Sequence, residues 1–223
     1  MIPLKDRNPT RRFPFVTILL IAANILIFLY ELSLGPRLEG FMARYSVIPV
    51  SIVQALTSGL SNPRALITLF TSLFIHGGWL HVGGNMLYLW IFGDNVEDKL
   101  GHFRYFIFYI ICGLAASALH IYFAPASTMP TIGASGAISG VLGAYLLMFP
   151  RARVLTLIPI FIFIKLAELP AYLILIFWFI LQFFNGVLSL GNEAAGMGGV
   201  AWWAHVGGFL TGLILVFPFR KYP

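Results

Sequence analysis

The sequence predicts an all-α, polytopic membrane protein, and three observations support this prediction. Hydrophobic residues make up 59% of the 223 residues, charged residues only 10%, and the mean hydropathy is +0.89. Long apolar runs alternate with short polar joints, a pattern that excludes a soluble globular protein and makes the lipid bilayer the expected surroundings. The length fits one compact bundle of about six transmembrane helices and leaves no room for a second domain.

Six segments are predicted to span the membrane, because each offers close to the 20 or so residues that a helix needs to cross it. They cover residues 15–34, 79–98, 103–123, 132–149, 169–190 and 200–219. Residues 1–13, which include several charged side chains, are expected to form a cytoplasmic N-tail. The first apolar segment is too long for a signal peptide and lacks a small-residue cleavage site, so we expect it to remain as a helix.

Three segments between the helices have a different character. Residues 35–78 form a long first insertion with short amphipathic pieces at 51–56 and 65–73, and we expect it to lie partly in the membrane interface. Residues 154–164 are apolar but too short to cross, and they are predicted to form an interfacial or re-entrant loop. The glycine-rich residues 191–199 are either a mobile cap over a site or a flexible connector.

The distribution of charge tests this topology. With the N-terminus in the cytoplasm, six spans leave Arg37, Arg44 and Arg64 outside and the other eleven of the 14 Lys and Arg residues inside. The positive-inside rule therefore favours six spans with both ends cytoplasmic. The carboxylates that end the second helix (Asp94, Glu97 and Asp98) are expected to pair with Lys99 or Arg104. The net charge of +6 does not indicate nucleic-acid binding, because the basic residues flank the apolar segments.

Polar residues recur near the beginnings of the second, fourth and sixth predicted helices: His81 and Asn85, then Ser135, then His205. Under this topology Ser135 and His205 would lie about 6–9 Å inside the outer leaflet. Glycines at three- and four-residue spacing form a stripe on the fourth helix (Gly133, Gly136, Gly140, Gly143), and the sixth helix also carries glycines (Gly207, Gly208, Gly212). Such stripes let helices approach closely. A packing role alone would explain the glycines, whereas an ionisable residue inside a membrane indicates a functional site.

Ser135 and His205 suit the roles of a nucleophile and its base, provided that the two helices meet. Acyl transfer also needs hydrogen-bond donors where the tetrahedral oxygen develops. Asn85, His81 and the backbone N–H of Ser135 are the candidates for these donors.

At this point the sequence resembles the rhomboid intramembrane serine proteases. Four patterns of that family occur in the right order and on the expected helices, and together they span nearly the whole chain. They are His-x-x-x-Asn (His81, Asn85), Gly-x-x-x-Glu-x-x-x-Gly (Gly93, Glu97, Gly101), Gly-x-Ser-Gly (Gly133 to Gly136) and Ala-His-x-x-Gly-x-x-x-Gly (Ala204, His205, Gly208, Gly212).

The resemblance implies a single rhomboid-like membrane domain over residues 1–223 and a Ser135–His205 dyad without an acidic third member. It also implies an oxyanion site at Asn85, His81 and the Ser135 amide. Its expected partners are single-pass transmembrane protein substrates, cut near the outer ends of their helices after a small residue. No cofactor, metal or nucleic acid is expected, and the small extramembrane mass favours a prokaryotic inner membrane as the host.

Two alternatives and one departure stay open. A catalytically silent rhomboid-like binder or chaperone would lose the serine or the histidine, and both are present. A small transporter or channel would predict ionisable residues near the midplane or inverted repeats, and neither is visible. Many family members have an aromatic residue at the position of Ser139 that stacks on the histidine. Trp202, Trp203 or a hydrogen bond from Ser139 are the candidates for orienting His205 instead.

Overall fold

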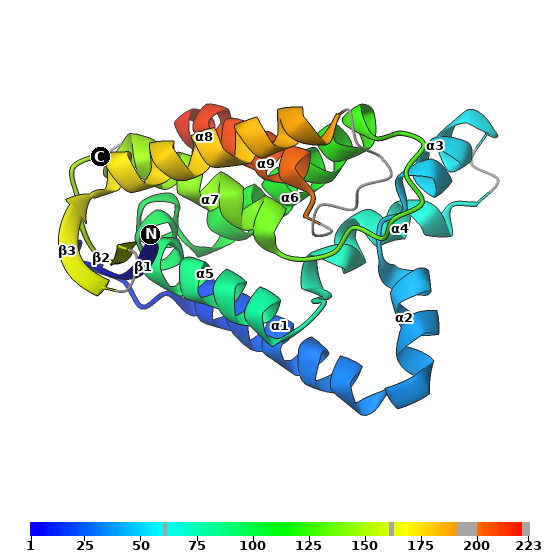
Figure 1. Ribbon diagram of the computed structural model, residues 1–223, viewed down its shortest axis with the longest axis horizontal. Helices are drawn as coiled ribbons and strands as arrows, with labels where there is room; N and C mark the ends of the chain where they lie inside the picture. Colours follow the sequence, from blue (N-terminus) through cyan, green and yellow to red (C-terminus); the bar gives the residue numbers. More distant parts are fainter. Residues whose placement is uncertain (60–61, 161–162, 191–199, 220–223) are drawn as a thin grey trace.

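A computed structural model of the chain describes residues 1–59, 62–160, 163–190 and 200–219 (Figure 1). Helices make up most of it, and a small sheet covers one end of the bundle. In chain order the elements are β1 (Ile2–Asp6), α1 (Phe15–Ser33), η1 (Gly35–Arg37), α2 (Leu38–Tyr45), α3 (Pro49–Thr57), α4 (Arg64–Thr71), η2 (Ser72–Phe74), α5 (Trp79–Leu100), α6 (His102–Phe123), α7 (Ser135–Met148), β2 (Arg153–Ile160), β3 (Phe163–Pro170), α8 (Ala171–Ser189) and α9 (Trp202–Phe219). The predicted helical membrane bundle is confirmed.

Four of the described helices, α1, α6, α8 and α9, are long and apolar enough to cross a membrane. Residues 64–74 and α5 are bent by 77° at the break between them and form either a fifth, broken span or a re-entrant loop beside a helix. Helix α7 is apolar but only 14 residues long. The protein is therefore a multi-pass membrane protein, and the count of six spans stays a prediction. Strand β1 and the end of α9 lie at the same end of the bundle (Figure 1), as an even number of crossings requires.

Helix α7 lies in the middle of the bundle, between a layer of α1 and α5 and a layer of α8 and α9 (Figure 1). It touches α9 backbone to backbone. A Cβ atom at Gly208 would lie 1.9 Å from the carbonyl oxygen of Gly136, and one at Gly212 would lie 2.0 Å from that of Gly140. Because these distances are far below van der Waals contact, only glycine fits at both positions of α9. The prediction that glycines let these two helices approach is confirmed.

The start of α7 differs from the prediction. The fourth helix was expected from residue 132, but it begins at Ser135. Gly133 has a φ of +114°, a conformation that glycine adopts readily and that cannot continue a right-handed helix. Gly133 is therefore part of the connection before α7 and not of its glycine stripe. Ser135 is the first residue of its helix instead of lying several residues inside it.

Glu97 on α5 fixes the beginning of α1. Its carboxylate accepts the backbone N–H groups of Val16 and Thr17 and the Thr17 hydroxyl, at 2.7–2.8 Å. Helix α1 has no side-chain cap of its own at Pro14, so the buried carboxylate supplies the acceptors that its first turn lacks and lies at the favourable end of the helix dipole. The predicted pairing of Glu97 with Lys99 or Arg104 is wrong. The Glu97 carboxylate also contacts the ring of His102.

The described residues of the predicted loop, 154–160 and 163–164, form strands instead. Strands β2 and β3 pair antiparallel, and β1 adds to the other edge of β2, with Ile2 opposite Leu157 and Asp6 opposite Val154. The N-tail therefore contains a strand. The physical reason is that two bare strands are marginal in stability, whereas a third gives β2 a partner on both sides. Whether β2 and β3 lie in the membrane interface stays a prediction.

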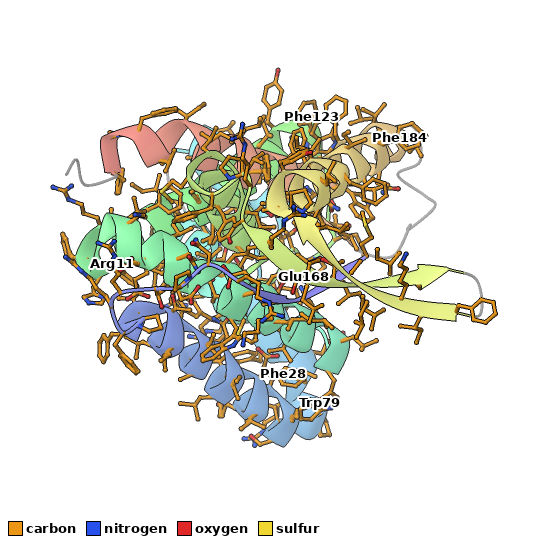
Figure 2. The ribbon with its side chains drawn as sticks, turned by 90° about the vertical axis from the view of Figure 1, so that its left-hand side faces the viewer. Arg11, Phe28, Trp79, Phe123, Glu168 and Phe184 are labelled. Atoms are coloured by element: carbon orange, nitrogen blue, oxygen red, sulfur yellow. The ribbon has the colours of Figure 1, made fainter. Side chains whose placement is uncertain are left out.

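Side chains fasten this sheet to the helices. Arg7 forms an ion pair with Glu168 of β3 at 2.8 Å. Asp6 accepts hydrogen bonds from the Tyr145 hydroxyl on α7 at 2.8 Å and from the Asn95 amide on α5 at 3.0 Å. Figure 2 looks onto this end of the bundle and shows Glu168 near its centre, with β2 and β3 extending to one side.

The long first insertion folds into short helices at the opposite end of the bundle (Figure 1). The two amphipathic pieces expected within it are confirmed as α3 and α4. A small separate cluster of buried side chains, including Val47 and Ile52, holds these helices against the C-terminal end of α6, which contributes Ile121. The backbone of Val47 pairs with that of Thr131, which ties the insertion to the segment leading into α7.

The contact between α7 and α9 predicts a position-specific effect of adding one methyl group. Gly212→Ala should destabilise the protein by about 1–3 kcal/mol, because its Cβ meets backbone that cannot move aside. Gly83→Ala on α5 is the matched control. A Cβ there has open space, and alanine favours the helix by up to about 1 kcal/mol. Thermal unfolding in detergent compares the two, and equal midpoints would contradict the backbone contact.

Asp6 predicts a pH dependence of stability. Burial raises the pKa of Asp6 to about 6, above its usual value of about 4. The folded protein therefore binds this proton more tightly than the unfolded chain does. The free energy of unfolding should fall as pH rises from about 4 to about 6 and then level off. Asp6→Asn should remove this part of the slope. Thermal midpoints between pH 4 and pH 8 test it, and parallel profiles for the two proteins would count against it.

Candidate active site

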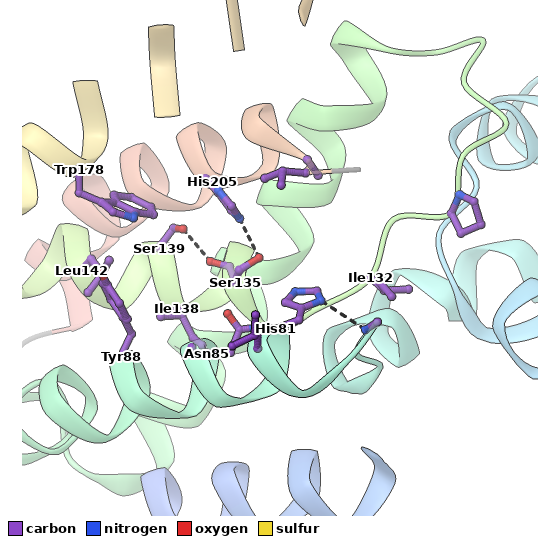
Figure 3. A pocket seen from close by; sticks show the side chains of 16 residues that line it. His81, Asn85, Tyr88, Ile132, Ser135, Ile138, Ser139, Leu142, Trp178 and His205 are labelled. Atoms are coloured by element: carbon purple, nitrogen blue, oxygen red, sulfur yellow. Dashed lines mark hydrogen bonds between the residues drawn. The ribbon is translucent and has the colours of Figure 1, made fainter. Parts of the chain in front are cut away.

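Ser135 and His205 meet at the start of α7 and near the start of α9. The Oγ of Ser135 lies 2.8 Å from Nε2 of His205 (Figure 3). The two residues are 70 positions apart in the sequence, and the glycine contact between their helices brings them together. Both were singled out from the sequence, and the structure places them within hydrogen-bond distance.

A cavity of about 630 Å³ opens beside this pair. Helices α5, α7, α8 and α9 and the segment before α7 all contribute to its walls. Its polar lining includes His81, Asn85, Ser135, Ser139 and His205, and its apolar lining includes Ile132, Ile138, Leu142 and Trp178 (Figure 3). A hollow of this size, apolar with a few convergent polar groups, is typical of a ligand or substrate site.

His81 and Asn85 are one turn apart on α5, and both line the cavity, as predicted. The Nδ1 atom of His81 accepts the backbone N–H of Gly77 at 3.3 Å (Figure 3). A ring that accepts at Nδ1 carries its hydrogen on Nε2 when neutral. A Cβ atom at Gly133 would lie 2.6 Å from that Nε2, so the His81 ring rests against the chain two residues before Ser135.

The side-chain nitrogen of Asn85 lies 2.9 Å from Nε2 of His76. His76 is a buried residue in the bend before α5, and its backbone N–H lies 3.3 Å from both carboxylate oxygens of Glu31 on α1. Asn85 has two N–H donors, so a second one is available to the cavity. No role for His76 or Glu31 in the site could be predicted from the sequence, because their contact with each other and that of His76 with Asn85 depend on how α1 packs against the bend.

The position of Ser135 at a helix start frees its backbone N–H. In the interior of a helix this group would bond to the carbonyl four residues earlier. The first turn of a helix has no such partners, and its dipole favours negative charge. Because α7 begins at Ser135, the position of this residue supports the expectation that the Ser135 amide can bind an oxyanion.

The structure answers what orients His205. Ser139 donates its hydroxyl to the backbone carbonyl of Ser135 at 2.6 Å, and Trp203 stacks on Phe123 with ring centres 3.8 Å apart. The Trp202 ring is perpendicular to that of His205, with centres 6.3 Å apart. The Nδ1 atom of His205 instead lies 2.8 Å from Oε1 of Gln182 on α8.

The sequence analysis missed Gln182. Helix α8 is the most apolar of the described spans after α1, and Gln182 is buried within it. A polar side chain inside a membrane span is by itself a reason to look for a function, and that signal was present in the sequence. Only the packing of α8 against α9 shows which residue it meets.

Two further expectations concern the surroundings of the site. The cap considered at residues 191–199 lies outside the described residues. Among the residues that the structure describes, no group of three or more His, Cys, Asp or Glu side chains is arranged to hold a metal ion. The expectation that the site works without a metal or cofactor stays a prediction.

The fold and the cavity define a multi-pass helical membrane protein with a serine and a histidine paired inside its bundle. Comparison with known proteins identifies the family: the Rhomboid domain matches residues 63–222. The chain belongs to the rhomboid family.

Three relatives illustrate the similarity. Rhomboid protein 1, mitochondrial, of Saccharomyces cerevisiae is 27% identical over 201 residues, covering 87% of this chain and 50% of the yeast protein. RHOMBOID-like protein 1 of Arabidopsis thaliana is 28% identical, covering 95% of this chain and 54% of its own length. Rhomboid protease GluP of Bacillus subtilis is 33% identical over 134 residues, covering 60% of this chain and 24% of GluP. The chain thus spans about half the length of the first two relatives.

Proposed function

We propose that this protein is an intramembrane serine endopeptidase that cleaves transmembrane segments of other membrane proteins. The observation that carries the proposal is the 2.8 Å approach of Ser135 Oγ to His205 Nε2 beside a cavity within the helix bundle. A nucleophile within hydrogen-bond reach of its base is the arrangement that acyl transfer requires. Membership of a family that includes a protease by name supports the same reaction.

The reaction proceeds in two acyl-transfer steps. His205 Nε2 takes the hydroxyl proton as Ser135 Oγ bonds to the scissile carbonyl carbon, and then gives it to the leaving amine as the C–N bond breaks. Water then attacks the acyl carbon as His205 Nε2 takes its proton, and the bond between that carbon and Ser135 Oγ breaks as the proton passes to Oγ. This releases the carboxylic acid product and restores the serine. The Ser135 amide, a second N–H of Asn85 and Nε2–H of His81 are the donors proposed for the oxyanion that develops in each step.

The site's position bears on the substrate. A transmembrane helix hides its scissile carbonyl within intrahelical hydrogen bonds, so the segment to be cut must unwind before Ser135 can attack it. We therefore infer that substrates are single-pass proteins whose helices contain helix-weakening residues near the outer end. The cavity lies at the end of α7 that points away from the sheet (Figure 1), which places it near the outer surface if the sheet is cytoplasmic.

The cytoplasmic placement of both chain ends follows from the distribution of basic residues and stays a prediction. The relatives include a mitochondrial yeast protein and a bacterial protease. They therefore do not favour the expected prokaryotic inner membrane over an organelle membrane.

Replacing either member of the dyad should abolish cleavage of a single-pass reporter in liposomes. Ser135→Ala and His205→Ala should each lower the rate by at least about 10³-fold, since residues that act as one unit are each indispensable. Ser139→Ala is the matched control, because its hydroxyl faces the Ser135 carbonyl and not the dyad, and it should retain activity. A fluorophosphonate should label the wild type but not Ser135→Ala. A wild type that is inert on a broad reporter panel and unlabelled would favour a binding protein.

Loss of an oxyanion donor should affect turnover more than binding. Asn85→Ala should lower kcat by about 10²–10³-fold with little change in KM, because the donor acts where charge develops. Asn185→Ala, which removes an amide that bonds within α8, should leave both constants unchanged. Steady-state cleavage kinetics separate the two constants. A rise in KM alone for Asn85→Ala would assign this residue to substrate binding instead.

A further inference from the structure

We propose that Gln182 is a positioning residue that fixes the tautomer and the orientation of His205. The proposal rests on the protease function proposed above and adds a third member to the dyad. Oε1 of Gln182 lies 2.8 Å from Nδ1 of His205, and Nε2 of the same ring lies 2.8 Å from Ser135 Oγ (Figure 3 shows the second contact). The imidazole is thus held at both nitrogens, by α8 on one side and α7 on the other.

A second hydrogen bond determines which way the Gln182 amide faces. Its Nε2 donates to the backbone carbonyl of Trp178 at 3.2 Å. A carbonyl only accepts, so the amide nitrogen must lie on that side and Oε1 must face the histidine. The orientation of the amide therefore follows from α8's own backbone.

The orientation of the amide dictates the tautomer of the ring. Since Oε1 can only accept, Nδ1 of His205 must carry a hydrogen to bond with it. In the neutral ring the lone pair is then on Nε2, the atom that faces Ser135. This is the form that can take the hydroxyl proton. The other tautomer would turn an N–H toward Ser135 and would leave Oε1 and Nδ1 facing each other without a hydrogen.

Of the groups around His205, Gln182 is the one placed to bond to Nδ1 and so to set the tautomer of the ring. The ring's recorded hydrogen-bond partners in the described part of the chain are Ser135 and Gln182. Trp178 and Trp202 lie near the ring with centres 5.8 and 6.3 Å away, and they restrict its plane without bonding to its nitrogens. The titratable residues that interact electrostatically with the His205 ring are His81 from α5 and His120 from α6.

A neutral amide suits a site inside the bundle. A buried carboxylate at this position would need partners for its full charge, whereas the amide is satisfied by one donor and one acceptor. The amide oxygen still places the negative end of a dipole next to the imidazolium that forms during each step. We expect this help to be weaker than that of a carboxylate, so a carboxylate should alter the pH dependence of the reaction.

Three variants in the full-length protein test the role. Gln182→Leu keeps the approximate size and removes the acceptor, and it should lower kcat by about 10–100-fold, as loss of an orienting partner commonly does, with KM unchanged. Gln182→Glu keeps an acceptor at the same reach and adds charge. It should restore much of the activity and move the acidic limb of the kcat/KM profile to higher pH, because a nearby negative charge favours the imidazolium. Asn185→Leu, on the exposed part of the same helix, should match the wild type.

A merely structural role for Gln182 gives a different pattern. It predicts that Gln182→Leu and Asn185→Leu differ in thermal midpoint and not in kcat at a temperature where both are folded, and that Gln182→Glu leaves the acidic limb in place. Either result overturns the proposal. If the wild type itself neither cleaves the reporter nor reacts with the fluorophosphonate, the proposed function fails instead.

A readout that does not depend on activity keeps the two cases apart. The ¹⁵N shifts of the His205 ring should show a protonated Nδ1 and an unprotonated Nε2 at neutral pH in the wild type. Gln182→Leu should produce a mixture of tautomers. An unchanged tautomer in Gln182→Leu would show that Gln182 does not set it, whether or not the protein is an active protease.

Discussion

The backbone contact between α7 and α9 is the constraint on which the rest of the site depends. Glycines at positions 208 and 212 lie against the carbonyl groups of Gly136 and Gly140 at distances that leave no room for a Cβ atom. Helices held this closely bring the residues at their beginnings within reach of each other. Any larger side chain in the seam would separate the helices, and the Ser135–His205 hydrogen bond is too short to tolerate that separation.

Close packing brings Ser135 to His205 but provides no hydrogen-bond donors for an oxyanion. The conformation of the chain at the start of α7 provides them. Gly133 turns the chain into the helix with a positive φ, so Ser135 occupies the first position and its N–H has no intrahelical partner. The same turn lays the chain against His81. The conformation at Gly133 thus positions Ser135, leaves the Ser135 N–H without an intrahelical partner and places the His81 ring, a second donor, at the edge of the site.

The end of the bundle opposite the site is fastened by polar contacts between distant segments. Glu97 caps α1, and the N-terminal strand β1 pairs with β2 while Asp6 bonds to α5 and α7. Apolar helices in a bilayer gain little from hydrophobic association with one another, so such hydrogen bonds and close contacts are what specify their arrangement. These contacts hold α5 and α7, which carry most of the cavity wall, at a fixed spacing.

The sequence by itself determined the membrane class, the positions of the long helices to within a few residues, and four of the polar residues that line the cavity (His81, Asn85, Ser135 and His205). Apolar run length, glycine spacing and ionisable residues in lipid are local signals. It also identified the family through motifs in order. Only the tertiary structure decided that residues 154–160 and 163–164 belong to strands, that Glu97 caps α1 and that Gln182 meets His205. Each of these depends on a partner far away in the chain, and a lone amide or carboxylate looks the same in the sequence whichever group it bonds.

The beginning of α7 was also decided by the structure. A glycine before a helix can either extend the helix or stop it. The contacts of Gly133 with Ser72 and His81 hold it in a conformation that stops the helix.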